Sequence, residues 1–480
     1  MRPSIQAEKS QAGNYVVAAL FIVVGIFMAS AFATGDIGTA SLVVFLPLAV
    51  GLIALIIVNP YLGLLFYLHY SFFFIGLNRY VPSLPLGLSI DAVLFLSSLS
   101  MIIRLHKDNV KKLNNGFFAT TILWFLYTIG EVLNPEAENL AAWVYAARGL
   151  SFYAIQTVPL TLLLFDKKEH LNRFIRAVIF WGVIGAFWGL KQIKIGVDPF
   201  ENAWLEAGGK TTHVLSGQLR AFSFFSDAGQ FGVTMAYAAF LSLMMALGPV
   251  KLSSKFWYLL GFVICIVGMG TSGSRGPVFV VFFGVITYLF MSRNYRILVP
   301  GISFIVVVFV FLKFTYIGNS NYQIYRIRTA LDPNEASLLV RLSNQDKLRI
   351  YLKTRPFGSG IGTTDSWARR FYPKSYLVDL PTDSWFVKVW VENGVVGLSI
   401  YALSLSFVIV MAVVNIGKVK NPDSRQKLIA LYGGFLGVVI ASFGNPVFGQ
   451  APLGVLMYMS MTMLSNAESY DEPEQLPELT

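Results

Sequence analysis

Residues 256–292 read FWYLLGFVICIVGMGTSGSRGPVFVVFFGVITYLFMS, and this stretch decides the fold. It holds two apolar runs, 256–271 and 277–292, separated by a short turn of Gly, Ser and Arg. Helices of roughly 20 apolar residues cross a bilayer, and comparable runs recur along the whole chain. Apolar residues make up 55% of the 480 positions and charged residues only 13%, well below the share of about 25% in soluble domains. The sequence therefore predicts an all-α, polytopic integral membrane protein.

The apolar runs predict 12–14 transmembrane helices, because the second and third runs could instead form a re-entrant hairpin at Asn59-Pro60. We expect eleven spans in residues 1–317, a large helical extracytoplasmic loop at 318–384, three spans in 385–465 and a disordered acidic cytoplasmic tail at 466–480. The expected spans lie at about 14–34, 40–58, 60–78, 85–103, 116–133, 146–165, 175–191, 229–247, 256–271, 277–292, 297–315, 386–414, 428–445 and 450–465.

Five clusters of Lys and Arg predict the orientation in the membrane. All five fall on one side of the expected spans, and the opposite short loops are nearly free of basic residues. This is the positive-inside pattern, so we expect a multi-pass protein with its N-terminus inside. The formal net charge of +11 largely reflects this pattern and does not indicate nucleic acid as a partner. The clusters lie at about 104–112, 167–176, 251–255, 293–296 and 418–427.

Three arginines are expected on the outer face: Arg148, Arg220 and Arg275. A guanidinium group fits phosphate oxygens in bidentate fashion and keeps its charge. The Gly and Ser residues around Arg275 also leave backbone N–H groups available at a helix start, which favours an anion. The alternative is that each arginine anchors a helix end to lipid headgroups or pairs with a carboxylate. Cys265, the single cysteine, lies in an expected span, so we expect no disulfide within the chain and no Cys/His metal site.

The 318–384 segment is the long polar interruption of the membrane pattern, and long ordered insertions usually serve a function. It is net basic, and Arg341 and Arg355 stand among aromatic residues such as Tyr351, which suits stacking on sugars and cations. The alternative is a small amphipathic cap whose aromatic residues form its core. The Gly-rich turn at residues 355–362 could cradle a phosphate, but it has neither a preceding strand nor a Lys-Ser/Thr ending.

Asp383 and Ser384 close this segment at the expected membrane face. A carboxylate in this place could act as a general base. The alternative is an N-cap for the helix that starts at Trp385, a role that Asp favours. Asp365 and Asp379 in the same segment are further carboxylates that could serve as a base.

Taken in order, these pieces resemble the O-antigen ligase/polymerase superfamily of bacterial envelope glycosyltransferases. The ligases of that superfamily close their outer loop with His, then Asn, Ser or Gln, nine residues, Gly, two residues and Gly. Here Ser384, Gly394 and Gly397 are in register with that motif, and Asp383 stands where the ligases have His. The Arg220 segment, the Ser-Arg-Gly turn at Arg275 and the loop carrying Arg341 also match, so the resemblance covers roughly residues 220–397.

The resemblance implies transfer of a saccharide from an undecaprenyl-diphosphate carrier to a sugar hydroxyl on the outer face of the bacterial cytoplasmic (inner) membrane. Such an enzyme would be inverting, without a metal or another cofactor. Its partners would be the carrier-linked saccharide, an acceptor glycan or glycolipid and the lipid bilayer. The sequence leaves open whether a chain-length regulator is a further partner. The missing His favours a polymerase of O-antigen or exopolysaccharide units over a ligase. A lipid-linked saccharide flippase or transporter is the alternative of another class.

The same resemblance assigns expected roles to individual residues. Arg220 and Arg275 would stabilise the diphosphate leaving group, with Arg341 as a secondary cation. Asp383 would deprotonate the acceptor hydroxyl. The remaining expected substrate contacts are Arg148, Arg355, Ser384 and Tyr351.

Overall fold

The computed structural model describes residue 25 and residues 37–82, 86–215, 217–292, 295–319, 322–329, 332 and 334–471. The expected first span, 14–34, lies outside this part apart from Gly25. The regular structure there is almost entirely helical, and its two short strands, β1 (Val214–Leu215) and β2 (Gln218–Leu219), form one antiparallel hairpin. The predicted class, an all-α polytopic membrane protein, is confirmed.

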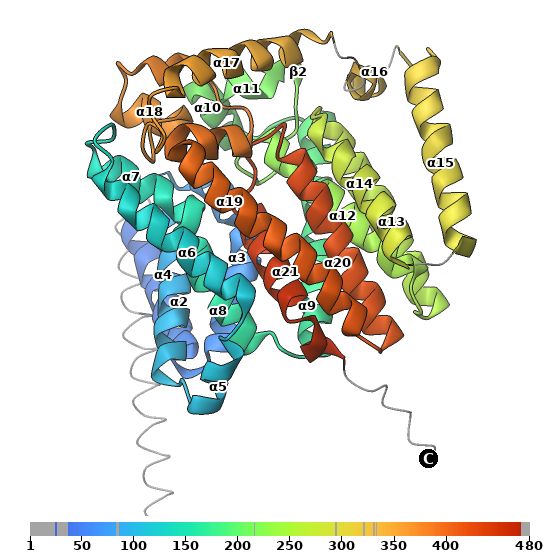
Figure 1. Cartoon of the computed structure of the whole chain (residues 1–480), viewed down its shortest axis with the longest axis horizontal. Coiled ribbons are helices and arrows are strands. Elements are labelled where there is room, and N and C mark those ends of the chain that lie inside the picture. Colours follow the sequence, from blue (N-terminus) through green and yellow to red (C-terminus); the bar gives the residue numbers. More distant parts are fainter. Residues whose placement is uncertain are drawn as a thin grey trace, which may run out of the picture.

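The helices follow the apolar runs closely (Figure 1). The first half of the chain forms α2 (Ile37–Val58), α3 (Pro60–Tyr80), α4 (Leu86–Ile103), α5 (Lys107–Lys112), α6 (Gly116–Gly130), η1 (Glu131–Leu133), α7 (Leu140–Ala147), the π-helix η2 (Arg148–Phe152), α8 (Tyr153–Leu164), α9 (Lys168–Lys194), α10 (Pro199–Trp204), the π-helix η3 (Leu205–Gly209) and α11 (Lys210–His213). The second half forms α12 (Ala228–Leu247), α13 (Leu252–Thr271), α14 (Gly276–Ser292), α15 (Tyr295–Phe314), α16 (Tyr322–Thr329), α17 (Ala336–Leu352), α18 (Asp365–Phe371), η4 (Tyr376–Asp379), α19 (Trp385–Lys418), α20 (Pro422–Ala441), α21 (Leu453–Ser465) and η5 (Ala467–Tyr470).

Seven of the described helical segments are long and apolar enough to cross a membrane: α3, α4, α6 with η1, α9, α12, α13 and α19. Residues Pro47–Val58 of α2, together with α14 and α21, are shorter apolar helices. The orientation, the exact number of spans and the domain boundaries stay predictions. The expected span at 146–165 is not one α-helix, because the π-helical turn η2 interrupts it.

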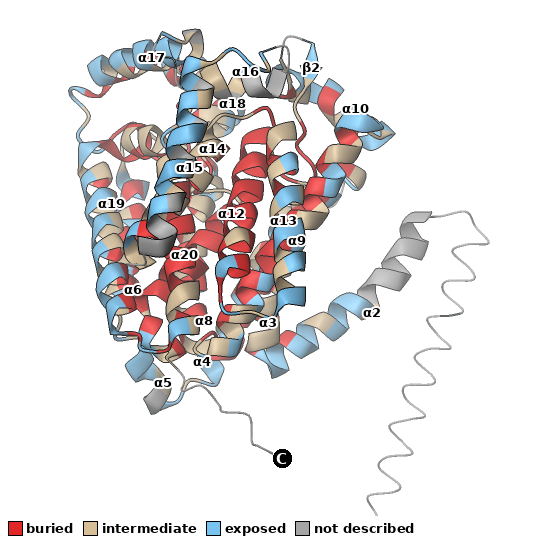
Figure 2. Cartoon of the chain, turned by 90° about the vertical axis from the view of Figure 1, so that its right-hand side faces the viewer, coloured by how far each residue is buried: buried red, intermediate tan, exposed pale blue. Residues whose placement is uncertain are grey.

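The centre of the bundle is α12, which is buried along nearly its whole length (Figure 2). It packs against α9, α13, α14 and α20. The contact between α14 and α20 requires small residues: a Cβ atom at Gly437 would lie 2.4 Å from the Val280 carbonyl oxygen, and one at Gly433 would lie 2.8 Å from that of Gly284. Glycines at such crossings let membrane helices approach closely, and they fix the position of the start of α14.

Two chain segments that are far apart in sequence meet at one end of the bundle. The segment with α10, α11 and the β-hairpin lies there, and so do α16, α17 and α18 of the 318–384 segment, whereas α5 lies at the opposite end (Figure 1). The charge pattern predicts the 318–384 segment to be outside, and Arg220, which follows β2, is expected on the same outer face. Residues from both can therefore contribute to a single site.

The C-terminal tail differs in part from the expectation of disorder. Tyr470 in η5 is buried, and its hydroxyl donates to the Phe165 carbonyl oxygen. The Asp471 carboxylate accepts from the backbone N–H groups of Lys420 at 3.0 Å and Asn421 at 2.6 Å. The prediction is therefore wrong for residues 466–471, because a buried aromatic ring and a capping carboxylate attach them to the bundle. Residues 472–480 lie outside the described part.

Candidate active site

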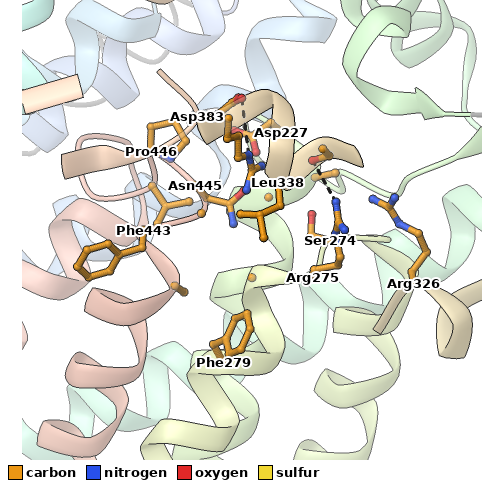
Figure 3. A pocket seen from close by; sticks show the side chains of 18 of the residues that line it. Asp227, Ser274, Arg275, Phe279, Arg326, Leu338, Asp383, Phe443, Asn445 and Pro446 are labelled. Carbon is orange, nitrogen blue, oxygen red and sulfur yellow. Dashed lines mark hydrogen bonds and ion pairs between the residues drawn. The ribbon is translucent and has the colours of Figure 1, made fainter. Parts of the chain in front are cut away.

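A cavity of about 730 Å³ opens where the N-termini of α12 and α14 meet α16, α17 and the turn between α20 and α21 (Figure 3). Four of the eight residues selected from the sequence line it: Arg220, Arg275, Arg341 and Asp383. Ala228, Gly229 and Gly276, at the first turns of α12 and α14, also line it. The positive ends of two helix dipoles therefore face a space that contains several guanidinium groups, an arrangement that favours an anion.

Arg220 connects the β-hairpin with the turn before α14. Its guanidinium donates from Nε to the Ser272 carbonyl oxygen at 3.1 Å, from Nη1 to the Thr212 carbonyl oxygen at 3.1 Å, and from Nη2 to the Ser274 hydroxyl. The next residue, Ala221, donates its backbone N–H to the Thr271 carbonyl oxygen at 3.0 Å. The Arg220 segment and the Ser-Arg-Gly turn, separate motifs in the sequence, thus form one structural unit.

Arg275 stands directly before α14 and is paired with a residue of the 318–384 segment. Its Nη1 lies 2.8 Å from Glu335 Oε1, and its Nη2 donates to the Ser337 hydroxyl at 3.2 Å. Glu335 is also the N-cap of α17, since its other oxygen accepts from the Leu338 N–H at 2.9 Å. Burial works to raise the pKa of Glu335, but the bonds from Arg275 and from backbone N–H groups outweigh it, and the pKa lies below its usual value. This contact docks α17 onto the start of α14.

Asp383 lies beside Arg341 in the cavity lining, with Arg341 Nε 3.7 Å from Asp383 Oδ2. Its φ angle of +47° places it in the left-handed region, which side-chain-bearing residues rarely adopt. The N-cap position of α19 belongs to Ser384 and not to Asp383. The interpretation of Asp383 as the helix cap is therefore wrong. A strained backbone that aims a carboxylate into a cavity is a feature that clusters at functional sites.

Among the further polar residues that line the cavity, the sequence analysis did not select Asp227, Arg326 and Asn445. Asp227 is the N-cap of α12, and its Oδ1 accepts from the Gln230 N–H at 2.9 Å. It directly precedes an apolar run, so an N-cap could have been predicted from sequence. Arg326 is one of many basic residues in its segment, and nothing in the sequence distinguishes it.

Asn445 lies in the turn between α20 and α21, and its amide occupies the space between the two helix N-termini. A Cβ atom at Gly276 would lie 2.3 Å from Asn445 Nδ2, and one at Gly229 would lie 3.1 Å from Asn445 Oδ1. A side chain at the first turn of α14 would therefore displace the Asn445 amide, which lies at the cavity wall. No sequence signal marks this residue, because the contact joins three distant parts of the chain.

The other four predicted site residues do not line the cavity. Arg148 lies in the π-helix η2, 2.6 Å from Asp91, and donates to the Gly87 carbonyl oxygen at 2.7 Å. Arg148 therefore pairs with a carboxylate and a backbone carbonyl, as expected if its role is to anchor a helix end and not to bind substrate. The hydroxyl of Ser384 is buried and donates to the Ser442 carbonyl oxygen at 3.3 Å.

Arg355 and Tyr351 contact each other away from the cavity. The guanidinium carbon of Arg355 lies 4.2 Å from the centre of the Tyr351 ring, and its Nε lies 3.2 Å from Glu136 Oε2. The pair therefore joins the 318–384 segment to the turn between η1 and α7. Its contacts support a structural role.

The Gly-rich turn at 355–362 docks against α19 and does not form a phosphate cradle. The backbone N–H groups of Ser359 and Gly360 donate to the carbonyl oxygens of Val391 at 2.8 Å and Glu392 at 3.0 Å. Gly394 has φ +65°, and a Cβ atom there would lie 2.0 Å from the Pro356 carbonyl oxygen. The glycine of the closing motif thus breaks α19 where the turn packs against it, and this fixes the end of the segment that carries Asp383.

A buried ion-pair cluster lies beneath this join. Lys388 Nζ lies 3.2 Å from Asp365 Oδ2 and 3.3 Å from Glu392 Oε1. Burial tends to raise the pKa of Asp365, yet Lys388 and the hydrogen bonds from Thr382 bring it below its usual value. Asp365 and Asp379, the alternative bases, do not line the cavity. Asp365 is instead committed to a structural ion pair.

The fold and the cavity together define a polytopic membrane protein with a large cavity, lined by both charged and apolar residues, at one end of the bundle. Residues 260–402 match the family model described as O-antigen ligase, a stretch that runs from α13 into α19 and includes Arg275, Arg341 and Asp383. Over this part of the chain the protein is similar to the O-antigen ligase family, and the match supports membership in the O-antigen ligase/polymerase family, which implies a glycosyl-transfer enzyme in general. A comparison with curated proteins gave no match.

Proposed function

We propose that the protein is an inverting membrane glycosyltransferase that uses this cavity to polymerise O-antigen or exopolysaccharide repeat units. It would transfer a saccharide from an undecaprenyl-diphosphate carrier to a sugar hydroxyl on the outer face of the bacterial cytoplasmic membrane. One observation carries the proposal. Arg220, Arg275, Arg341 and Asp383, which come from four separate places in the sequence, line a single cavity.

The basic side of the cavity suits a diphosphate leaving group. The bond that breaks joins the anomeric carbon to a phosphate oxygen, so negative charge develops on the diphosphate as the reaction proceeds. Arg220 and Arg275 lie beside the first turn of α14 and can stabilise this charge together with the helix dipole. Because their positions are fixed by hydrogen bonds to the surrounding turns, little reorganisation is needed during the reaction.

Asp383 supplies the base in this proposal. The acceptor hydroxyl attacks the anomeric carbon from the side opposite the leaving diphosphate, and its proton passes to the Asp383 carboxylate. A new bond between acceptor oxygen and anomeric carbon forms as the bond to the diphosphate breaks, so the anomeric configuration inverts. Arg341, 3.7 Å from the carboxylate, helps to hold Asp383 toward the cavity.

The cavity also has an apolar wall that suits the prenyl chain of a carrier. Phe279 and Phe283 lie one helical turn apart on α14, and Ile440 and Phe443 face the cavity from the end of α20. The apolar lining therefore begins near Arg275 and continues along α14. A substrate with a charged head and an apolar tail matches this arrangement.

A ligase that moves finished glycan to lipid A-core or to another anchor is the second candidate, because the matching family model is that of the ligases. Asp383 at the position of the ligase His favours the polymerase. The glycan-lipid profile of a deletion strain separates the two. Loss of long chains with one capped unit retained indicates a polymerase, whereas accumulation of long carrier-linked chains indicates a ligase. Unchanged glycans with carrier-linked saccharide accumulating inside the cell would instead indicate a flippase.

The arginine roles are tested by substitution in purified protein. Arg220→Ala and Arg275→Ala should abolish most transfer without lowering the protein level. The Lys variants should recover little, because an ammonium group cannot reproduce the guanidinium fork. Arg349→Ala is the matched control, since this arginine of α17 is largely exposed, pairs only locally with Asp346 and does not line the cavity. Normal activity of the Lys variants would contradict bidentate phosphate binding.

A further inference from the structure

Arg326 reaches the cavity from α16 and contacts the same turn as Arg220 (Figure 3). Its Nη2 and Nε lie 3.2 and 3.4 Å from the carbonyl oxygen of Gly273, to which they donate. Gly273 has φ +57°, and a Cβ atom there would lie 3.3 Å from Arg220 Cγ. The turn before α14 is therefore flanked by two guanidinium groups, one from the β-hairpin and one from the 318–384 segment.

The arginines of the cavity differ in their partners. Arg275 and Arg341 each face a carboxylate, Glu335 and Asp383. Arg326 has a neutral carbonyl as its partner, and within the described part of the chain no carboxylate lies within ion-pair distance of it. A guanidinium group has five N–H donors, and two of those of Arg326 point to one oxygen. Its charge is thus not neutralised by the described residues around it.

We propose that Arg326 binds the donor's diphosphate together with Arg220, so that α16 completes the phosphate site. This inference rests on the proposed function and adds a residue to it. A diphosphate diester carries two negative charges, and two guanidinium groups beside the same turn can each contact a phosphate. Since the rest of the site comes largely from the bundle, this contact would attach the 318–384 segment to the bound donor. It would also favour a diphosphate over a monophosphate carrier.

The test measures binding of undecaprenyl diphosphate and undecaprenyl monophosphate to the full chain in nanodiscs. Charge-assisted hydrogen bonds to phosphate contribute about ten- to a hundredfold in affinity. Arg326→Ala should weaken binding of the diphosphate by about that factor and reduce the preference over the monophosphate. Arg328→Ala is the matched control: it lies on the same helix, but its guanidinium bonds to Thr315 Oγ1 and the Ile317 carbonyl oxygen, and it does not line the cavity.

A second variant separates phosphate binding from support of the turn. Arg326→Gln keeps an amide N–H that can donate to the Gly273 carbonyl oxygen but removes the charge, so it should bind the diphosphate as poorly as Arg326→Ala. Wild-type affinity in Arg326→Gln, or in Arg326→Ala, would overturn the inference while leaving the proposed function intact. Failure of the unmodified protein to bind the diphosphate lipid would instead count against the proposed function.

Discussion

Replacing Asp383 by Asn removes the proposed base and leaves the geometry of the site nearly unchanged. The two side chains have the same shape, and both residue types tolerate the left-handed backbone that Asp383 adopts at φ +47°. Alanine is a poorer probe, because a residue without a local hydrogen-bonding side chain costs roughly 1–2 kcal/mol in this conformation. Asn therefore isolates the chemistry, whereas Ala combines the loss of the base with backbone strain.

The expected effects on stability and on rate are very different in size. The contact with Arg341 is 3.7 Å long between side chains that are 33% and 41% exposed, and an ion pair this exposed contributes about 0–1 kcal/mol. Asp383→Asn should therefore melt close to the unmodified protein. Loss of a general base typically slows a reaction about 10²–10⁴-fold, which corresponds to roughly 3–5 kcal/mol in the activation barrier.

The assay is transfer of a carrier-linked saccharide by purified protein in nanodiscs, together with thermal unfolding of the same samples. Asp383→Gly should be at least as stable as the unmodified protein, since glycine relieves the strain, and yet inactive. Asp346→Asn on α17 is the control, because Asp346 is exposed and does not line the cavity. Turnover near the normal rate in Asp383→Asn would refute the base role, and Asp227 would be the next carboxylate to test.

In a cysteine-free background, Val340→Cys should be labelled from outside intact cells and Lys420→Cys should not; labelling of both from one side would contradict the orientation. Gly394→Ala should lower stability by several kcal/mol, because the added methyl group would lie 2.0 Å from the Pro356 carbonyl oxygen in a left-handed residue; an unchanged melting temperature would exclude this close approach. Since the pKa of Glu335 is lowered, its contribution is full above about pH 4.3 and disappears as the pH falls through the lowered value. Protease protection of α17 should therefore persist from pH 7 to 5, and Glu335→Gln should reduce it at every pH in that range.

The fold class could be predicted from the sequence for physical reasons, and four of the eight candidate residues line one cavity. Apolar runs report directly on membrane helices, because a lipid environment requires every backbone group to bond within its own helix. Arg220, Arg275 and Arg341 stand in segments that interrupt or flank these runs, where a charged group has to have a function or a partner. The sequence does not show which of these two alternatives holds.

Whether an arginine has a functional or a structural role depends on the residue that it pairs with, and that residue is usually distant in the sequence. Asp91 pairs with Arg148, and Glu136 pairs with Arg355, across separate helices and turns. Neither pairing follows from local spacing, so both arginines were expected in the site and lie outside it. Asn445 shows the reverse case, since its place in the cavity depends on glycines at the starts of two other helices.

Charge pairing in the cavity shows why net composition is a poor guide to the substrate. The 318–384 segment is net basic, yet the cavity lining contains equal numbers of Arg and Asp or Glu: Arg220, Arg275, Arg326 and Arg341 against Asp227, Asp332, Glu335 and Asp383. Paired charges stabilise the empty cavity, because a desolvated guanidinium group without a partner is unfavourable. An incoming diphosphate must therefore either displace a carboxylate or bind where none is engaged. Arg326 meets the second condition, because its partner is the Gly273 carbonyl oxygen and not a carboxylate. The turn that contains Gly273 lies beside the N-terminus of α14. Selectivity for a doubly charged carrier would then arise from the distribution of the carboxylates as much as from the number of arginines.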